Sequence, residues 1–129
     1  MILIFGDMKC YEKTDQIYSQ AVEAGYMNED DKNKSVELFN QGYKSLSKEE
    51  MNDVVKIDSS LAAMQLMLVA RAHGYDTNPI GGFEKDQLAE AFGLDPNRYV
   101  PVIIVSIGKA DHAGHKSPRL DVKDITDFK

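Results

Sequence analysis

The chain has 129 residues, of which 43% are hydrophobic and 28% are charged, a balance typical of one globular domain spanning residues 1–129. Its formal net charge of −6 argues against nucleic acid as a partner, because phosphate binding needs a basic face. The single cysteine, Cys10, excludes a disulfide within the chain and a zinc site built on cysteines. With no signal peptide and no apolar segment long enough to span a membrane, we expect a cytoplasmic protein without a membrane partner.

A short strand and two helices are predicted in the first third of the chain. The apolar run at residues 2–5 predicts a central strand. A helix is expected over residues 9–24, with Thr14 or Asp15 as its cap. A second helix is expected over residues 28–43, because its acidic first turn complements the helix dipole. This part of the chain is therefore expected to be mostly helical.

The most apolar helix of the sequence is predicted in the middle of the chain. Ser47 and Glu50 form a capping box that starts a short helix leading into it. The central helix is expected to begin near Asp58, which two serines follow, and to end at Gly74. Because it is apolar nearly all round, it is predicted to be buried on most sides. Beyond it, the chain is expected to leave the core and turn at Pro79.

One more helix and the clearest strand are predicted in the last third. The helix is expected over residues 84–92 and the strand over residues 99–108. The middle of this strand is continuously β-branched, so both of its faces are predicted to be buried. Residues 108–119 are polar and predicted to be irregular, and the tail after them is expected to hold a turn of helix and a final short strand.

Few side chains are candidates for catalysis or metal binding. His112 and His115, with Asp111 nearby, are a weak zinc candidate, since they lie in a loop and no HExxH helix occurs. Cys10 has no neighbouring histidine to activate it as a nucleophile, so a bystander role is favoured. Neither a serine-hydrolase elbow nor a phosphate-binding glycine motif is present. The sequence therefore assigns no catalytic side chain and no metal ligand.

Two stretches point to a bound ligand, although an ordinary turn and a solvated loop are the alternatives. The stretch at residues 79–83, Pro-Ile-Gly-Gly-Phe, lets the backbone approach a ligand closely and offers amide groups ahead of a helix. The stretch at residues 116–119 carries Lys116 and Arg119, which suit contacts to phosphate. Together they fit a ligand with a flat ring at one end and a phosphate at the other.

At these residues the chain resembles the FMN-dependent nitroreductase family. The resemblance rests on the central helix with PIGGF, on the VPVIIVSIG strand and on KSPRL, which occur here in the family's order and spacing. It implies an α+β fold, a nitroreductase-like sandwich whose mixed, mostly antiparallel sheet is flanked by helices. The family's amino-terminal Arg-x-Ser-x-Arg stretch does not occur in this sequence. An incomplete form of the fold, its C-terminal portion, is therefore expected.

The resemblance also implies which residues hold the cofactor. The two glycines would approach the reactive edge of the flavin ring, the two residues before them would line one face of the ring, and the basic pair would hold the FMN phosphate. Pro118 is an extra residue relative to the family's commoner Lys-x-Arg form. The sequence therefore matches the family's motif better at Arg119 than at Lys116. The implied contacts are Pro79, Ile80, Gly81, Gly82, Lys116 and Arg119.

The activity implied by the resemblance is that of an NAD(P)H-dependent flavin oxidoreductase. Hydride would pass from NAD(P)H through FMN to a nitroaromatic, a quinone or a similar small-molecule acceptor. A homodimer with FMN at its interface is implied as well. The alternative, motivated by the absent amino-terminal stretch, is a truncated non-catalytic remnant that folds as a dimer or with another chain.

Overall fold

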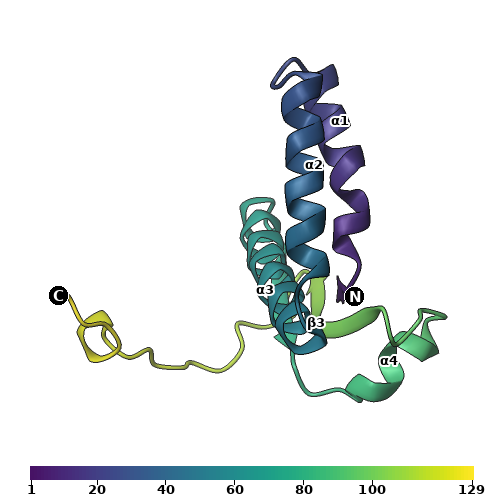
Figure 1. The fold of residues 1–129 in the computed structure, drawn as a ribbon. Helices are drawn as coiled ribbons and strands as arrows, with labels where there is room; N and C mark the ends of the chain where they lie inside the picture. Colours follow the sequence, from purple (N-terminus) through teal and green to yellow (C-terminus); the bar gives the residue numbers. More distant parts are fainter.

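Three antiparallel strands form the sheet that positions the other elements in the computed structural model, which describes residues 1–129 (Figure 1). The strands are β1 (Ile2–Asp7), β2 (Asp76–Ile80) and β3 (Tyr99–Gly108), in the order β1-β3-β2. The central strand is β3, and its Val105 is completely buried. The strands predicted at residues 2–5 and 99–108 are thus confirmed, and every pairing in this sheet is antiparallel.

The strand β2 corrects the prediction of a turn at Pro79. All five of its residues pair with the second half of β3, from Asp76 opposite Gly108 to Ile80 opposite Ile104. Proline lacks the N–H that an interior strand must donate, which is why the sequence suggested a turn. In the order β1-β3-β2, however, β2 has only one neighbour, and an edge strand accommodates proline.

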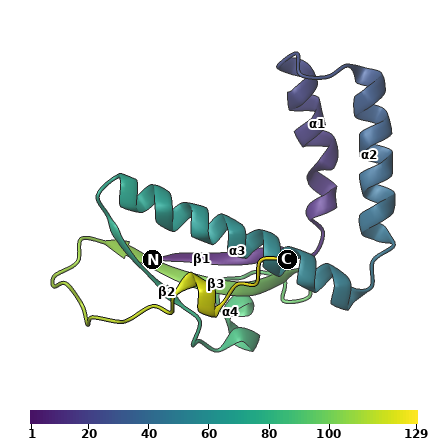
Figure 2. The same ribbon diagram turned by 90° about the vertical axis from the view of Figure 1, so that its left-hand side faces the viewer.

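One continuous helix, α3 (Lys48–Ala72), crosses a face of the sheet (Figure 2). Its start confirms the capping box, because the Ser47 hydroxyl accepts from the Glu50 N–H and the Glu50 carboxylate accepts from the Ser47 N–H. The prediction of a separate start near residue 58 is wrong. The Ser60 hydroxyl donates to the Lys56 carbonyl, 2.7 Å away, so this side chain is satisfied inside the helix. Gly74, with φ of 76°, follows the helix end as predicted.

Only one side of α3 is buried, which corrects the prediction of burial on most sides. The buried residues of this helix are Met51, Val55, Ala63 and Ala70. The packing against β1 is close at Gly6, where an added Cβ would lie 2.6 Å from the Val55 Cγ2 atom. The opposite side carries an exposed apolar stripe, which we define as Ile57, Leu61, Met64 and Leu68, each between 49% and 66% exposed.

A helical hairpin projects from the body at the end of β1 (Figures 1 and 2). It consists of the short 3-10 helix η1 (Cys10–Lys13), α1 (Thr14–Glu23) and α2 (Glu29–Lys44). Asn28 caps α2 by accepting from the Asp31 N–H at 2.8 Å. The predicted caps of α1 are wrong, because η1 runs directly into α1 and the hydroxyl of Thr14 donates to the Tyr11 carbonyl.

The last elements are a short helix and an extended tail. The helix α4 (Lys85–Ala91) contacts β3 and buries Ala89, in agreement with the predicted helix. Residues 109–129, which we call the tail, leave the end of β3 and run away from the body (Figure 1). The tail holds only the 3-10 turn η2 (Val122–Asp124), so the predicted turn of helix is present and the final strand is not. Together these elements make the α+β fold that was predicted.

Candidate functional site

The glycine loop, Gly81 and Gly82, connects β2 to α4 and leaves its backbone open. Both residues are exposed, and a Cβ added to either would meet no atom within 4 Å. Neither N–H donates a hydrogen bond within the chain. Two exposed amide donors therefore have no acceptor within the chain, which fits a ligand that brings its own acceptor atoms.

The loop is held by rigid elements on its N-terminal side. Ile80 pairs with Ile104, a buried residue of the central strand, so the loop starts at a fixed point of the sheet. Pro79 is exposed and Ile80 is half-buried, so both lie beside the loop where a ring could rest on them. The structure thus brings together four of the six predicted cofactor contacts, residues 79–82, in one short segment.

The two remaining predicted contacts, Lys116 and Arg119, lie elsewhere on the exposed tail. Figure 1 shows the tail leaving the body on the side away from α4. No hydrogen bond or ion pair joins the basic pair to the glycine loop within one chain. The Arg119 Nη1 donates to the Ser117 hydroxyl at 2.8 Å and to the Pro118 carbonyl at 3.0 Å. Both partners are uncharged groups within two residues of Arg119. The guanidinium has no carboxylate partner and is therefore available to bind an anion.

Cys10 and the histidines carry no sign of a reactive centre. Burial, followed by the charges of Asp7 and Asp58, raises the pKa of the Cys10 thiol. The thiol is therefore protonated at neutral pH, which disfavours a nucleophile. No group of three or more His, Cys, Asp or Glu side chains lies close enough to hold a metal ion, and the His112 Nδ1 accepts from the Gly114 N–H at 3.1 Å.

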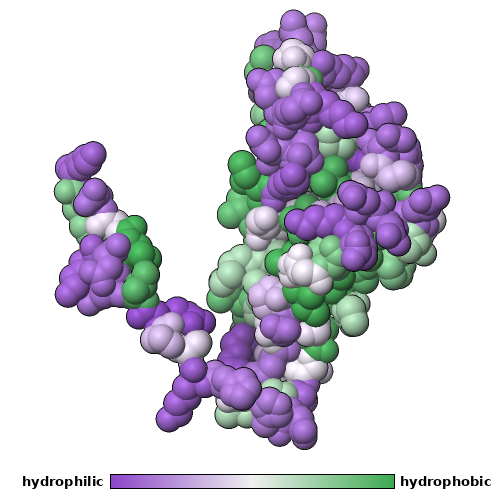
Figure 3. Space-filling model, turned by 90° about the horizontal axis from the view of Figure 1, so that it is seen from below, coloured by the Kyte–Doolittle hydropathy of each residue, from purple (hydrophilic) through white to green (hydrophobic).

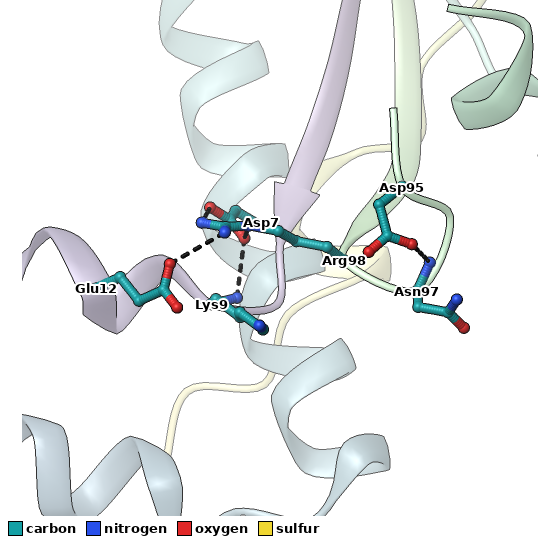
Figure 4. A network of polar contacts seen from close by, with 6 residues as sticks. All are labelled: Asp7, Lys9, Glu12, Asp95, Asn97 and Arg98. Atoms are coloured by element: carbon teal, nitrogen blue, oxygen red, sulfur yellow. Dashed lines mark hydrogen bonds and ion pairs between the residues drawn. The ribbon is translucent and has the colours of Figure 1, made fainter. Parts of the chain in front are cut away.

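A polar cluster at the base of the helical hairpin was not predicted (Figure 4). The Arg98 guanidinium binds Asp7 through two bonds of 2.8 Å and Glu12 through one of 3.0 Å. This bidentate contact with Arg98 holds the pKa of Asp7 below its usual value of 3.8. Because these residues lie in β1, in η1 and just before β3, the cluster fixes the hairpin to the sheet. No local pattern could have revealed it, since Asp7 and Arg98 lie 91 positions apart.

A cavity between α3, α4 and the first half of β3 was not predicted either. Its volume is about 520 Å³, and two lysines, Lys56 of α3 and Lys85 of α4, line it with Tyr99 and the residues after it. It lies beside the part of β3 that β2 does not cover. Because its lining comes from three elements that are separate in the sequence, no local pattern indicates it.

Comparison with known proteins agrees with this architecture. The model of the nitroreductase family matches residues 35–109, which is more than half of the chain. The chain therefore belongs to the nitroreductase family.

Curated relatives match along nearly the whole chain. A Bacillus subtilis protein, YdgI, whose name assigns it as an NAD(P)H nitroreductase, is 46% identical over 129 residues, covering 100% of this chain and 62% of its own length. The CLA biosynthesis enone reductase of Lactiplantibacillus plantarum is 34% identical over 128 residues, covering 99% of this chain and 59% of its own length. The chain thus spans about 60% of the length of the relatives that it matches.

Solved structures share the fold closely. One from Staphylococcus epidermidis, named as an NAD(P)H:FMN oxidoreductase, has a TM-score of 0.95 and 53% identity over 98% of this chain and 60% of its own. One from Exiguobacterium sibiricum, named as a nitroreductase in complex with FMN, has a TM-score of 0.91 and 53% identity over 97% of this chain and 60% of its own.

Among the helices of the present chain, none combines the length and the apolar character that a membrane crossing requires.

Proposed function

We propose that this chain supplies part of an FMN-dependent NAD(P)H oxidoreductase of the nitroreductase type. The observation that carries the proposal is the glycine loop, whose two N–H groups are exposed and donate to no atom of the chain. Membership of the nitroreductase family, with a 53% identical relative solved in complex with FMN, supports flavin as the ligand of this loop.

The residues fit the cofactor in three ways. The amides of Gly81 and Gly82 can donate to the electron-rich edge of a flavin ring, and no side chain obstructs them. Pro79 and Ile80 offer an apolar surface for one face of the ring. Arg119, with Lys116, offers positive charge for the phosphate. A flavin supplies hydride transfer when bound, so no side chain of this chain needs to act as an acid or a base.

The proposed reaction takes hydride from NAD(P)H and delivers it to a nitroaromatic, a quinone or a similar acceptor. The chain's residues would bind and orient the flavin, and amide donors near the ring would tune its electron affinity. The names of the relatives, which include NAD(P)H nitroreductases and an enone reductase, support a small electron-poor acceptor.

We also propose that the working unit contains a second copy of the chain. The apolar stripe of α3 repeats every three or four residues along one side of the helix, and its four side chains are about half to two-thirds exposed. Figure 3 shows apolar residues open on the surface of the body and others on the separate tail. The oligomeric state of the wild type and of Leu61→Glu, measured by sedimentation, tests whether two copies associate. A dimer that the variant dissociates supports the proposal, and a wild-type monomer contradicts it.

The experiment for the main proposal is a spectrum of the purified protein followed by an assay. Bound FMN, or FMN taken up on addition, is expected to give a flavin absorbance spectrum and NAD(P)H oxidation with a quinone or nitroaromatic acceptor. A colourless protein that neither binds added FMN nor oxidises NAD(P)H contradicts the proposal. That outcome would favour the alternative, a non-catalytic chain that associates through its apolar surface.

A further inference from the structure

A cluster of polar contacts ties the first two residues of the tail to the body. The Asp76 Oδ2 accepts from the Ala110 N–H at 3.1 Å, and its Oδ1 lies 2.5 Å from the Arg71 Nη1. The Lys109 ammonium donates to the Gly74 carbonyl and lies 4.8 Å from the centre of the Tyr75 ring. We call the contacts of Asp76 and Lys109 the tail anchor.

No hydrogen bond or ion pair of the tail beyond Ala110 reaches the body. The bonds within residues 111–129 are local, such as those of Arg119 with Ser117 and Pro118 and the ion pair of Lys123 with Asp121. The direction in which Lys116 and Arg119 leave the body is therefore set at the anchor. Asp76 is its centre, since this carboxylate binds both the tail and the end of α3.

The position of Asp76 relates the tail to the glycine loop. Asp76 begins β2, and the glycine loop follows the last residue of the same strand, Ile80. At about 3.3 Å per residue, the strand separates the anchor from the loop by roughly 13 Å. The chain from Ala110 to Lys116 can span up to about 20 Å when extended, so length does not prevent the basic pair from reaching a ligand held at the loop.

We propose that Asp76 is a positioning residue for the phosphate end of the cofactor. This inference rests on the proposed function. By fixing the Ala110 N–H, the carboxylate restricts the directions that the tail can take, so that less conformational freedom is lost when Lys116 and Arg119 close on a phosphate. Asp76 touches neither the ring nor the phosphate itself, so its effect passes through the tail.

The test compares Asp76→Asn with the wild type for two flavins that differ only in the phosphate. Asparagine keeps the size of the side chain but loses the charge and one of its two acceptor oxygens. We expect FMN to bind about three- to tenfold more weakly to the variant, because a tail that is held less firmly loses more conformational freedom on binding. Riboflavin, which lacks the phosphate, is expected to bind both proteins equally. A merely structural role of Asp76 would weaken both flavins alike, and that result overturns the inference.

Two further measurements keep the outcomes distinct. The control variant Asp15→Asn removes another exposed carboxylate, which pairs with Lys32 at 3.3 Å on the hairpin, and is expected to leave the affinity for FMN unchanged. Arg119→Ala is expected to show the same selective loss of FMN affinity as Asp76→Asn. If Asp76→Asn binds FMN as tightly as the wild type, the positioning role of Asp76 is overturned and the proposed function is not. A wild-type chain that binds neither flavin overturns the proposed function, and the positioning role with it.

Discussion

The two ends of the proposed cofactor site are held with very different firmness. The glycine loop follows a strand that is paired along its whole length with the buried centre of the sheet. Lys116 and Arg119 lie on a tail that the anchor holds only at its first residues. The proposed ring contact is therefore in place before a ligand arrives, whereas the proposed phosphate contact would have to be ordered on binding, which costs affinity.

The largest expected effect on stability comes from disturbing the packing of the body at Gly6 of β1. A side chain here would collide with Val55, because an added Cβ lies 2.6 Å from the Val55 Cγ2 and 3.1 Å from its carbonyl oxygen. We expect Gly6→Val to lower the free energy of unfolding by about 1–3 kcal/mol through overpacking, as measured by denaturant unfolding. The control is Gly42→Ala, an open position in α2 where the change is expected to stabilise slightly. Equal stabilities of the wild type and Gly6→Val would refute the close packing of α3 on β1.

A smaller effect is expected from Asp7→Asn at the base of the hairpin. Asp7 forms an ion pair with Arg98, and both side chains are about one-quarter exposed, so solvent screens the pair in part. We expect the variant to lose about 1 kcal/mol in the free energy of unfolding. Because the pKa of Asp7 is lowered on folding, the pair stabilises the protein above about pH 4, the usual range of an aspartate. This stability is lost as the pH falls through the folded pKa. Unfolding curves between pH 2 and 7 should therefore differ in the neutral range and converge in acid, and a constant difference would contradict the ion pair.

In the tail, Arg119→Ala should affect binding rather than stability. The side chain is exposed and bonds only to its neighbours, so the melting temperature is expected to stay the same. The FMN dissociation constant is expected to rise about tenfold, the size of one lost contact to a charged group. Lys116→Ala should give a smaller rise, since lysine binds phosphate as a point charge. An FMN affinity that neither variant changes would remove the tail from the site.

Only a small change in stability is expected from a substitution in the glycine loop. Gly81→Ala places a methyl group in open space at a residue without a positive φ, so the free energy of unfolding should shift by less than about 0.5 kcal/mol. FMN binding should nevertheless weaken, because the methyl group lies where the ring would approach the backbone. Titration with FMN beside a thermal melt checks both parts, and unaltered binding would place the flavin elsewhere.

Local sequence signals predicted the elements they directly encode. The capping box at Ser47 and the β-branched residues before Ser106 each specify one local conformation, and the structure agrees with both. The glycine loop could be located for the same reason, as a short motif ahead of a helix.

The failures came from features that depend on distant residues. The strand at Pro79 exists because β3 pairs with it, and α3 is exposed on one side because the chain offers nothing to cover Leu61 and its neighbours. The cluster around Arg98 joins residues 91 positions apart, so no window of sequence contains it. The anchor at Asp76 likewise reaches 34 residues along the chain to Ala110. Periodicity and capping rules carry no information about such contacts.

The most direct test of the account is a fluorescence titration of the wild-type chain with FMN, with riboflavin in parallel. The account predicts saturable binding of both flavins, with FMN binding more tightly because the tail adds a phosphate contact to the ring contact at the glycine loop. The absence of saturable binding of either flavin would contradict it.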